Sequence, residues 1–152
     1  MPTPEYILTL REKIGHDYLW LSGATAVIRR DSDHRVLLVR RSDNGAWTPV
    51  TGIVDPGENT ALTCLREAHE EAGVEIEVLA LAQLKADPAM RFGNGDRCQF
   101  LDHTFLCRWV AGDARVNDDE STQVRWADMT DPTERAMLSE RMLDRIDAAL
   151  GY

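Results

Sequence analysis

The sequence predicts an α+β fold, in which a central mixed β-sheet lies between helices in a three-layer arrangement. Stretches rich in Val, Ile and Leu alternate along the chain with segments whose apolar residues recur at helical spacing. The chain has 152 residues, of which 43% are hydrophobic and 28% are charged, and this is the size and composition of one globular domain. We therefore expect a single domain over residues 1–152.

Three segments have helical periodicity and six have the composition of strands. The helices are predicted over about 3–14, 59–72 and 133–150. The strands are predicted over 24–30, 35–41, 46–54, 74–84, 98–110 and 123–127. The first two strands should form a hairpin because a short polar turn joins them, and Pro49 with Gly52 makes the third strand irregular. The Gly-rich stretch 86–97 has no periodicity, which predicts a mobile loop.

The helix near the N-terminus is amphipathic. Thr3 is its predicted N-cap, and Gly15 follows its last apolar residue as a stop. This helix can dock on its own sheet or pair with a second copy of the chain, and the sequence does not separate the two. A homodimer is therefore possible.

Charge and cysteine content narrow the function classes. The chain carries 17 Lys and Arg against 26 Asp and Glu, a formal net charge of −9. Such a surface repels a phosphate backbone, so we expect no duplex nucleic acid as a partner, although small phosphorylated ligands can bind if metal ions bridge the charges. No apolar run reaches the roughly 20 residues that cross a bilayer, and the three cysteines form no C-x-x-C pair. We expect a cytoplasmic protein with no membrane partner.

The helix predicted over 59–72 carries three glutamates on one side. Its small and apolar residues follow a separate stripe, made of Ala61, Leu65, Ala68 and Ala72. Glu67, Glu70 and Glu71 fall within about a third of the helix circumference, away from that stripe. Like charges four residues apart destabilise a helix, so helix stability gives no reason for the arrangement. A solvated helix face is one interpretation, and a bound divalent cation is the other.

The residues around these glutamates decide between the two. Seven fixed residues at set spacing run from Gly52 to Val74, and they are Gly52, Glu58, Arg66, Glu67, Glu70, Glu71 and Gly73. This segment resembles the Nudix box, G-x5-E-x7-R-E-U-x-E-E-x-G-U, with every position matched. The resemblance implies a Nudix hydrolase with the Nudix-type α/β/α sandwich, which cleaves the diphosphate linkage of a nucleoside diphosphate derivative by attack of water on phosphorus.

The resemblance also implies a metal site and its residues. Mg²⁺, or Mn²⁺ in its place, would be held by Glu67, Glu70 and Glu71, with Glu58 acting through water or as an outer ligand. Arg66 would orient the carboxylates by charge-assisted hydrogen bonds. The family often uses a backbone carbonyl just before the box as a ligand, and here Thr51 stands where a Gly is common. For the general base the candidates are Glu67 and Glu120. Glu120 is also a candidate metal ligand, since the family often places an extra ligand or base there, although its acidic turn can equally be solvated surface.

Substrate contacts are predicted from aromatic and basic residues outside the box. Trp47 and Phe92 could stack on a base, or they could be core residues. Arg91 and Arg97 could reach a phosphate or ribose, or they could be surface arginines. Pro88 lies where ADP-ribose-cleaving members tend to carry a proline, which favours ADP-ribose or another nucleotide sugar. The alternatives are a pyrophosphohydrolase of damaged nucleoside triphosphates and a non-catalytic nucleotide sensor.

Overall fold

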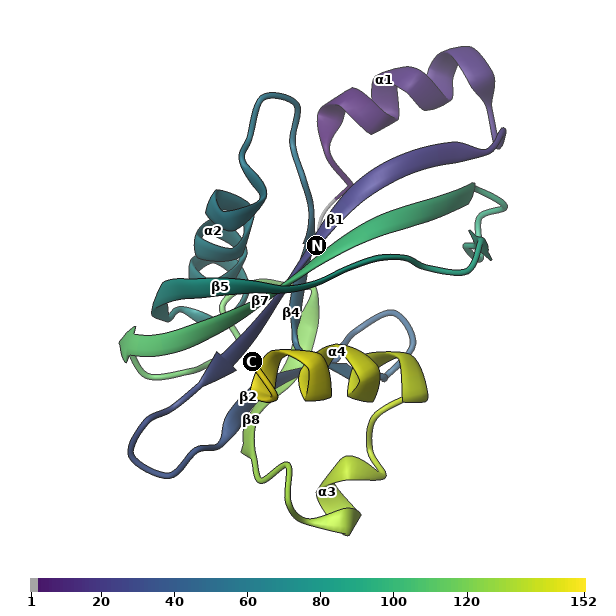
Figure 1. Cartoon of the computed structure of the whole chain (residues 1–152). Coiled ribbons are helices and arrows are strands. Elements are labelled where there is room, and N and C mark those ends of the chain that lie inside the picture. The colour runs from purple at the N-terminus through teal and green to yellow at the C-terminus, as the bar shows by residue number, and fades with distance from the viewer. Residues whose placement is uncertain (1–2) are drawn as a thin grey trace.

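The structure, a computed structural model, describes residues 3–152 and has the α/β/α sandwich that the sequence predicts (Figure 1). In chain order its elements are α1 (Glu5–Ile14), β1 (Leu19–Arg29), β2 (Val36–Arg41), β3 (Trp47–Thr48), β4 (Val50–Ile53), α2 (Thr60–Ala72), β5 (Glu75–Ala86), β6 (Met90–Arg91), β7 (Arg97–Ala111), β8 (Ser121–Ala127), α3 (Pro132–Arg135) and α4 (Glu140–Leu150). Across residues 3–152, no helix has the length and apolar character that a membrane crossing requires.

The strands form one mixed sheet whose central path runs β3, β2, β1, β7 and β5. β1 and β7 are parallel along the whole length of β1, and β5 pairs with β7 in the antiparallel direction. The predicted hairpin is confirmed, since β1 and β2 pair antiparallel at Arg29 and Val36. β4 adds to β1 on the side away from β7, and Pro49, which has no N–H to donate to a ladder, separates β3 from β4.

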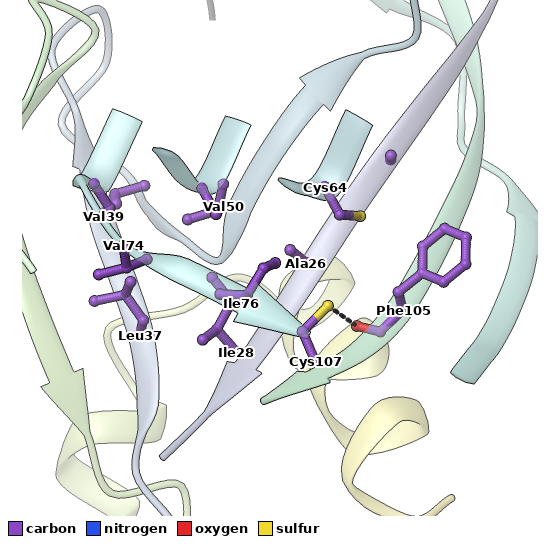
Figure 2. Packing of buried hydrophobic residues seen from close by; sticks show 13 residues of the cluster. Ala26, Ile28, Leu37, Val39, Val50, Cys64, Val74, Ile76, Phe105 and Cys107 are labelled. Carbon is purple, nitrogen blue, oxygen red and sulfur yellow. Dashed lines mark hydrogen bonds between the residues drawn. The ribbon is translucent and has the colours of Figure 1, made fainter. Parts of the chain in front are cut away.

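Two hydrophobic clusters lie on opposite faces of this sheet. Figure 2 shows the first, in which strand residues such as Ile28, Leu37 and Phe105 pack against Cys64 of α2. The second joins Val27 and Leu38 of the sheet to Met142 and Ile146 of α4. Figure 1 shows the consequence, with α2 and α4 covering different sides of the strands. All three cysteines are free and buried, so they serve as core residues.

The N-terminal helix α1 docks on its own sheet. Ile7 is 4% exposed and packs with Leu21, Ile53 and Cys98 in a third cluster. The residue at the N-cap is Pro4, with no side-chain cap, so the prediction of Thr3 as the cap is wrong. Pro suits this boundary because its fixed φ is compatible with the start of a helix.

The stretch 86–97 is partly a hairpin, so the prediction of an unstructured loop is wrong for its second half. β6 pairs with the start of β7, with Met90 opposite Cys98 and Arg91 opposite Arg97. Gly95 closes the turn at φ +93, a value that other residues rarely adopt. Periodicity missed this hairpin because β6 has only two residues.

The helix predicted over 133–150 is broken into α3 and α4. Residues 136–139 separate the two helices, and the Ser139 hydroxyl accepts a hydrogen bond from the backbone N–H of Met142 at 3.3 Å. Asp131 caps α3 in the same way, through the N–H of Thr133 at 2.8 Å. The apolar stripe continues across the break, and the second N-cap residue is what starts a new helix.

Candidate active site

The face of α2 that packs on the sheet is wider than the predicted stripe, since Ala68 and Ala72 are buried as expected but Glu67 and Glu71 are buried beside them. Leu65, expected in the core, is 38% exposed, whereas Glu67 and Glu71 are 3% and 5% exposed. The reason is that Cys64 points into the core, and residues three or four positions apart on a helix share a face. Glu67 follows Cys64 by three positions and Glu71 follows Glu67 by four. Two of the three predicted carboxylates are therefore held at the edge of the core, and only Glu70 faces solvent.

Arg66 is the hub of the acidic cluster. Its guanidinium donates to both oxygens of Glu58, with Nε to Oε2 at 2.8 Å and Nη2 to Oε1 at 2.9 Å. Nη1 donates to Glu67 Oε1 at 2.9 Å and lies 3.4 Å from Glu70 Oε2. Nη2 also donates to the carbonyl of Ile53 at 3.2 Å, which ties α2 to the end of β4. The predicted orienting role of Arg66 is consistent with this geometry.

Glu58 is committed to this network. Besides Arg66, its Oε1 accepts from the Thr63 hydroxyl at 2.6 Å and from the backbone N–H of Asp55 at 3.3 Å. These donors, with Arg66 the largest cause, lower the pKa of Glu58 to about 2. Glu58 therefore acts on the other glutamates by fixing Arg66.

Glu67 and Glu71 are held with one oxygen satisfied and one unsatisfied. Glu67 Oε1 accepts from Arg66 and Glu71 Oε1 accepts from the Ser121 hydroxyl at 2.9 Å. The Oε2 atom of each is buried without a hydrogen-bond partner in the described part of the chain. Burial raises the pKa of both carboxyls to about 7, opposed by Arg66 at Glu67 and by Ser121 at Glu71. Such atoms are costly unless something pairs with them.

These residues fit a divalent cation. Two buried carboxylate oxygens lack a donor, a third carboxylate, Glu70, stands beside them, and oxygen ligands of this kind suit Mg²⁺. Within residues 3–152 no three acidic, His or Cys side chains already converge as a closed metal cage. Mg²⁺ does not require one, because it keeps several waters and completes its shell with substrate phosphates.

A cavity of about 330 Å³ adjoins this acidic edge on the other face of the sheet. It is lined by residues of β1, β4, the 41–48 segment, the β6 hairpin and α4. Gly52 borders both the cavity and the acidic cluster. It lines the cavity, and a Cβ atom added to it would collide with Glu67. Gly52 is therefore the point at which the cavity and the acidic cluster meet.

The α4 side of the cavity holds charged residues that are buried. Asp87, Asp102 and Arg145 are 5%, 4% and 6% exposed, and all three line the cavity. Arg145 Nη2 lies 2.5 Å from Asp87 Oδ2, its Nε lies 3.4 Å from Asp102 Oδ2, and its Nη1 donates to the Thr25 hydroxyl at 3.0 Å. Burial raises the pKa of Asp87, opposed by Arg145. These groups form a buried polar floor of the cavity, whose other lining residues include both apolar side chains and the polar residues Arg41, Asp43, Asn44 and Arg141.

The other predicted residues divide between the cavity and the surface. Trp47, Thr51 and Phe92 line the cavity, and Trp47 also packs at the margin of the α4 cluster. Arg91 is exposed and is not among the cavity residues. Arg97 points toward the N-terminal segment, with Nη2 3.6 Å from Asp17 Oδ1.

Glu120 lies at the start of β8, next to the acidic cluster. Its backbone N–H donates to Asp118 Oδ1 at 3.1 Å, and its carbonyl accepts from the Ser42 backbone and hydroxyl. The hydrogen bond to Asp43 is the main cause that raises the pKa of the Arg41 guanidinium. The negative charges of Glu71 and Glu120 contribute further to this rise. The structure thus places Glu120 on the same side as Glu71.

Sequence reasoning missed Arg41 and the polar floor as site residues. Asp102 interrupts the apolar strand 98–110, and Arg145 interrupts the apolar stripe of the last helix. A charged residue at an inward position is the signal that could have found them. Arg41 carried no such signal, because its place beside Glu71 depends on the pairing of β2 with β8.

The chain matches the family model described as the NUDIX domain over residues 20–147. A "MutT-like protein" of Streptomyces ambofaciens is 31% identical over 131 residues, covering 85% of this chain and 78% of that protein. Among solved structures, a MutT NUDIX hydrolase from Burkholderia pseudomallei has a TM-score of 0.67 at 24% identity, covering 86% of this chain and 98% of that one.

Further similar proteins differ in the substrate that their names state. A Bacillus subtilis (strain 168) protein, named provisionally as an 8-oxo-dGTP diphosphatase, is 28% identical over 110 residues, covering 71% of this chain and 66% of that protein. An ADP-ribose pyrophosphatase from Streptococcus suis has a TM-score of 0.59 at 20% identity, covering 83% of this chain and 88% of that one. The family model and the Streptomyces relative agree with the box and with the fold: the chain belongs to the Nudix family and is a Nudix hydrolase.

Proposed function

We propose that this chain hydrolyses the diphosphate linkage of a nucleoside diphosphate derivative, with Mg²⁺ held by the glutamates of α2. The observation that carries the proposal is the pair of buried carboxylate oxygens without donors, Glu67 Oε2 and Glu71 Oε2, beside a cavity that could hold the rest of the substrate. A solvated helix face does not account for these atoms, because solvated oxygens have water as a partner. A non-catalytic sensor would not need all the box carboxylates.

The proposed roles follow from the contacts of each residue. Glu67, Glu70 and Glu71 would hold the ion, and the carbonyl of Thr51 is a further candidate ligand. Bound there, Mg²⁺ would neutralise diphosphate charge and lower the pKa of a bound water. Arg66 would hold and orient the carboxylates, and Glu58 would fix Arg66. Arg41, which lines the cavity, can donate to a phosphate oxygen entering from that side.

The general base is proposed to be Glu67, with Glu120 as the second candidate. Position supports Glu67, since a general base must lie within hydrogen-bond reach of the water it activates and Glu67 Oε2 has no hydrogen-bond donor among residues 3–152. Glu67 is also placed between Gly52 and Arg66, at the edge where cavity and acidic cluster meet. Glu120 is supported by its place near Glu71 and Arg41.

Two substrate classes fit this proposal. ADP-ribose or another nucleotide sugar is the first, on the resemblance at Pro88 and on the structural neighbour named for ADP-ribose. A nucleoside triphosphate, including a damaged one, is the second, and the Bacillus subtilis relative supports it. In both substrate classes, the nucleobase would lie in the cavity against Trp47 and Phe92, and the phosphates would extend toward Gly52.

The test is hydrolysis of a panel of ADP-ribose, other nucleotide sugars, dinucleoside polyphosphates, and normal and oxidised nucleoside triphosphates. Each is incubated with Mg²⁺, Mn²⁺ or EDTA, in water enriched in ¹⁸O. Cleavage of one class that EDTA abolishes, with ¹⁸O found in a phosphate product, supports the proposal and identifies the phosphorus attacked. A folded protein that binds Mg²⁺ and cleaves no member of the panel contradicts the proposal.

A further inference from the structure

The polar floor of the cavity has no place in the metal chemistry, and its chemistry points to a particular base. Its charged groups lie on the α4 face of the sheet, opposite to α2, and are therefore separate from the glutamates proposed to hold the ion. Thr25 and Asp102 extend from the neighbouring strands β1 and β7, and the Thr25 hydroxyl donates to Asp102 Oδ1 at 2.8 Å. Arg145 reaches this pair from α4.

Structural needs alone do not explain this network. Buried ion pairs contribute little to stability compared with apolar residues of similar volume, because desolvation offsets their attraction. The surrounding α4 face is apolar, with Val27, Leu106 and Ile146 close by, so apolar side chains would fit the site. The charges are also open to the cavity, where a ligand could contact them.

The carboxylates of Asp102 and Asp87 accept different numbers of hydrogen bonds from the protein. Asp102 accepts from Thr25 through Oδ1 and from the Thr104 hydroxyl through Oδ2 at 2.6 Å, and Arg145 lies beside Oδ2. Asp87 receives its side-chain hydrogen bond at Oδ2 from Arg145, and among residues 3–152 no donor is recorded for its Oδ1. Asp87 therefore has room for donors from a ligand, since a carboxylate offers about four acceptor positions.

We infer that Asp87 accepts hydrogen bonds from the N1–H and N2–H₂ groups of a guanine base, so that the cavity selects guanine nucleotides. This inference rests on the proposed function, because it takes the cavity as the substrate's site. A carboxylate is an acceptor only, and guanine presents two adjacent donors on that edge. Adenine presents one donor beside the acceptor N1, which would face the carboxylate and be repelled.

The rest of the cavity suits a flat base. Its walls carry the aromatic residues Trp47, Phe92 and Phe100 and the thioethers of Met90 and Met142. Aromatic faces stack on any base without selecting one, so the discrimination would come from the polar floor. A site built to hydrogen-bond a group also rejects analogues that lack it, because its own polar atoms are then left unpaired.

Selection of guanine would distinguish between the two proposed substrate classes. ADP-ribose carries adenine and would bind poorly, whereas GTP, dGTP and sugar derivatives of GDP carry the matching edge. A guanine oxidised at C8 keeps N1–H and N2–H₂, so the floor would accept both the normal and the oxidised base. Pro88 does not line this cavity but a neighbouring groove, which shares Asp87, Asp102 and Arg145 with it.

The test measures binding without catalysis. Metal-free protein in EDTA is titrated with GMP, AMP, CMP and UMP, and binding is followed by NMR and calorimetry. We expect GMP to bind at least about tenfold more tightly than AMP. Equal binding of GMP and AMP would overturn the inference, whatever the protein hydrolyses. Preference for GMP in a protein that cleaves nothing would leave the inference standing and contradict the proposed function.

Two variants locate the preference. Asp87→Asn should remove this preference. It should weaken the binding of GMP by at least about tenfold and change the affinities for CMP and UMP much less. The control is Asp144→Asn, which alters another aspartate paired with a cation, Lys85 at 2.8 Å, on the exposed side of α4, and it should leave all four affinities unchanged. Equal weakening of all four nucleotides by Asp87→Asn would mean that the ion pair only holds α4 in place, and would overturn the inference.

Discussion

The backbone of Gly52 packs directly against the side chain of Glu67, which leaves no room for a side chain on residue 52. A Cβ atom on Gly52 would lie 2.3 Å from Cγ of Glu67 and 2.6 Å from its Oε1. The first glycine of the box is therefore required by a side chain that comes fifteen positions later in the sequence. Its absence of a side chain lets Glu67 lie over β4, where its Oε1 accepts a hydrogen bond from Arg66 at 2.9 Å.

Gly52→Ala should displace Glu67 and lower the hydrolysis rate by at least about a hundredfold, because misplaced ligands cost that much or more. Overpacking should also lower the free energy of unfolding by about 1–3 kcal/mol. Turnover and urea denaturation measure the two effects. Gly93→Ala is the matched control, since a Cβ there meets nothing within 4 Å. Wild-type turnover in Gly52→Ala would show that Glu67 need not occupy this place.

Glu71→Gln should stabilise the metal-free protein at pH 8 by about 1–2 kcal/mol. The amide keeps an oxygen to accept from Ser121 and removes a buried charge whose Oε2 has no donor among residues 3–152. The same variant should reduce the rise in melting temperature that Mg²⁺ produces. Chemical denaturation in EDTA and thermal melts with Mg²⁺ measure these changes. A variant less stable than wild type in EDTA, with its full response to Mg²⁺, would argue against a metal site at Glu71.

The metal-free protein should lose stability as the pH rises from 5 to 8. Glu67 and Glu71 have pKa values of about 7 in the folded protein and an ordinary value of 4.5. Between these values the folded state binds more protons than the unfolded chain, so the free energy of unfolding falls with rising pH. The contribution is complete below pH 4.5 and is lost as the pH passes about 7. Saturating Mg²⁺ should remove most of this dependence, because it stabilises the ionised carboxylates.

This pH effect is measured by urea denaturation at pH 5, 6.5 and 8, with EDTA or with Mg²⁺. Glu71→Gln serves as the internal control, since it deletes one of the two titrating groups and should flatten the dependence in EDTA. A wild-type protein whose stability in EDTA rises between pH 6.5 and 8 would contradict the raised pKa values.

Arg66→Ala should cost about 2 kcal/mol of stability and most of the activity. Its guanidinium holds Glu58, Glu67 and the Ile53 carbonyl together, and hydrogen bonds to charged groups are worth this much when partly buried. Arg108→Ala removes an exposed arginine paired with Glu77 and should change neither quantity measurably. Denaturation curves and steady-state rates compare the two. If Arg66→Ala and Arg108→Ala changed stability and turnover equally, Arg66 would not organise the carboxylates as proposed.

Much of this site could be predicted because its information is local. The box glutamates, Arg66 and Gly52 follow a fixed spacing, and Gly73 ends α2 with the positive φ that a C-terminal stop requires. Composition likewise indicated the strands that form the centre of the sheet. The box lies within one continuous segment, 52–74, so its spacing can be read directly from the sequence.

Features that depend on distant partners could not be predicted. Leu65 fits the apolar stripe of α2, yet it is exposed. Packing on the sheet buries Glu67 and Glu71 together with the alanines of that stripe. The break before α4 depends on one serine cap inside a continuous apolar stripe. Asp87 and Arg145 stand 58 positions apart, and only the packing of α4 over β7 brings them together.

The central claim is that the glutamates of α2 hold the ion that hydrolysis requires, and Glu70→Gln tests it most directly. Glu70 faces solvent and its contact in the structure is a long one to Arg66, so the substitution should leave the melting temperature in EDTA unchanged. With the best substrate of the panel and saturating Mg²⁺, we expect turnover to fall by at least about a hundredfold. Turnover equal to that of the wild type would contradict it.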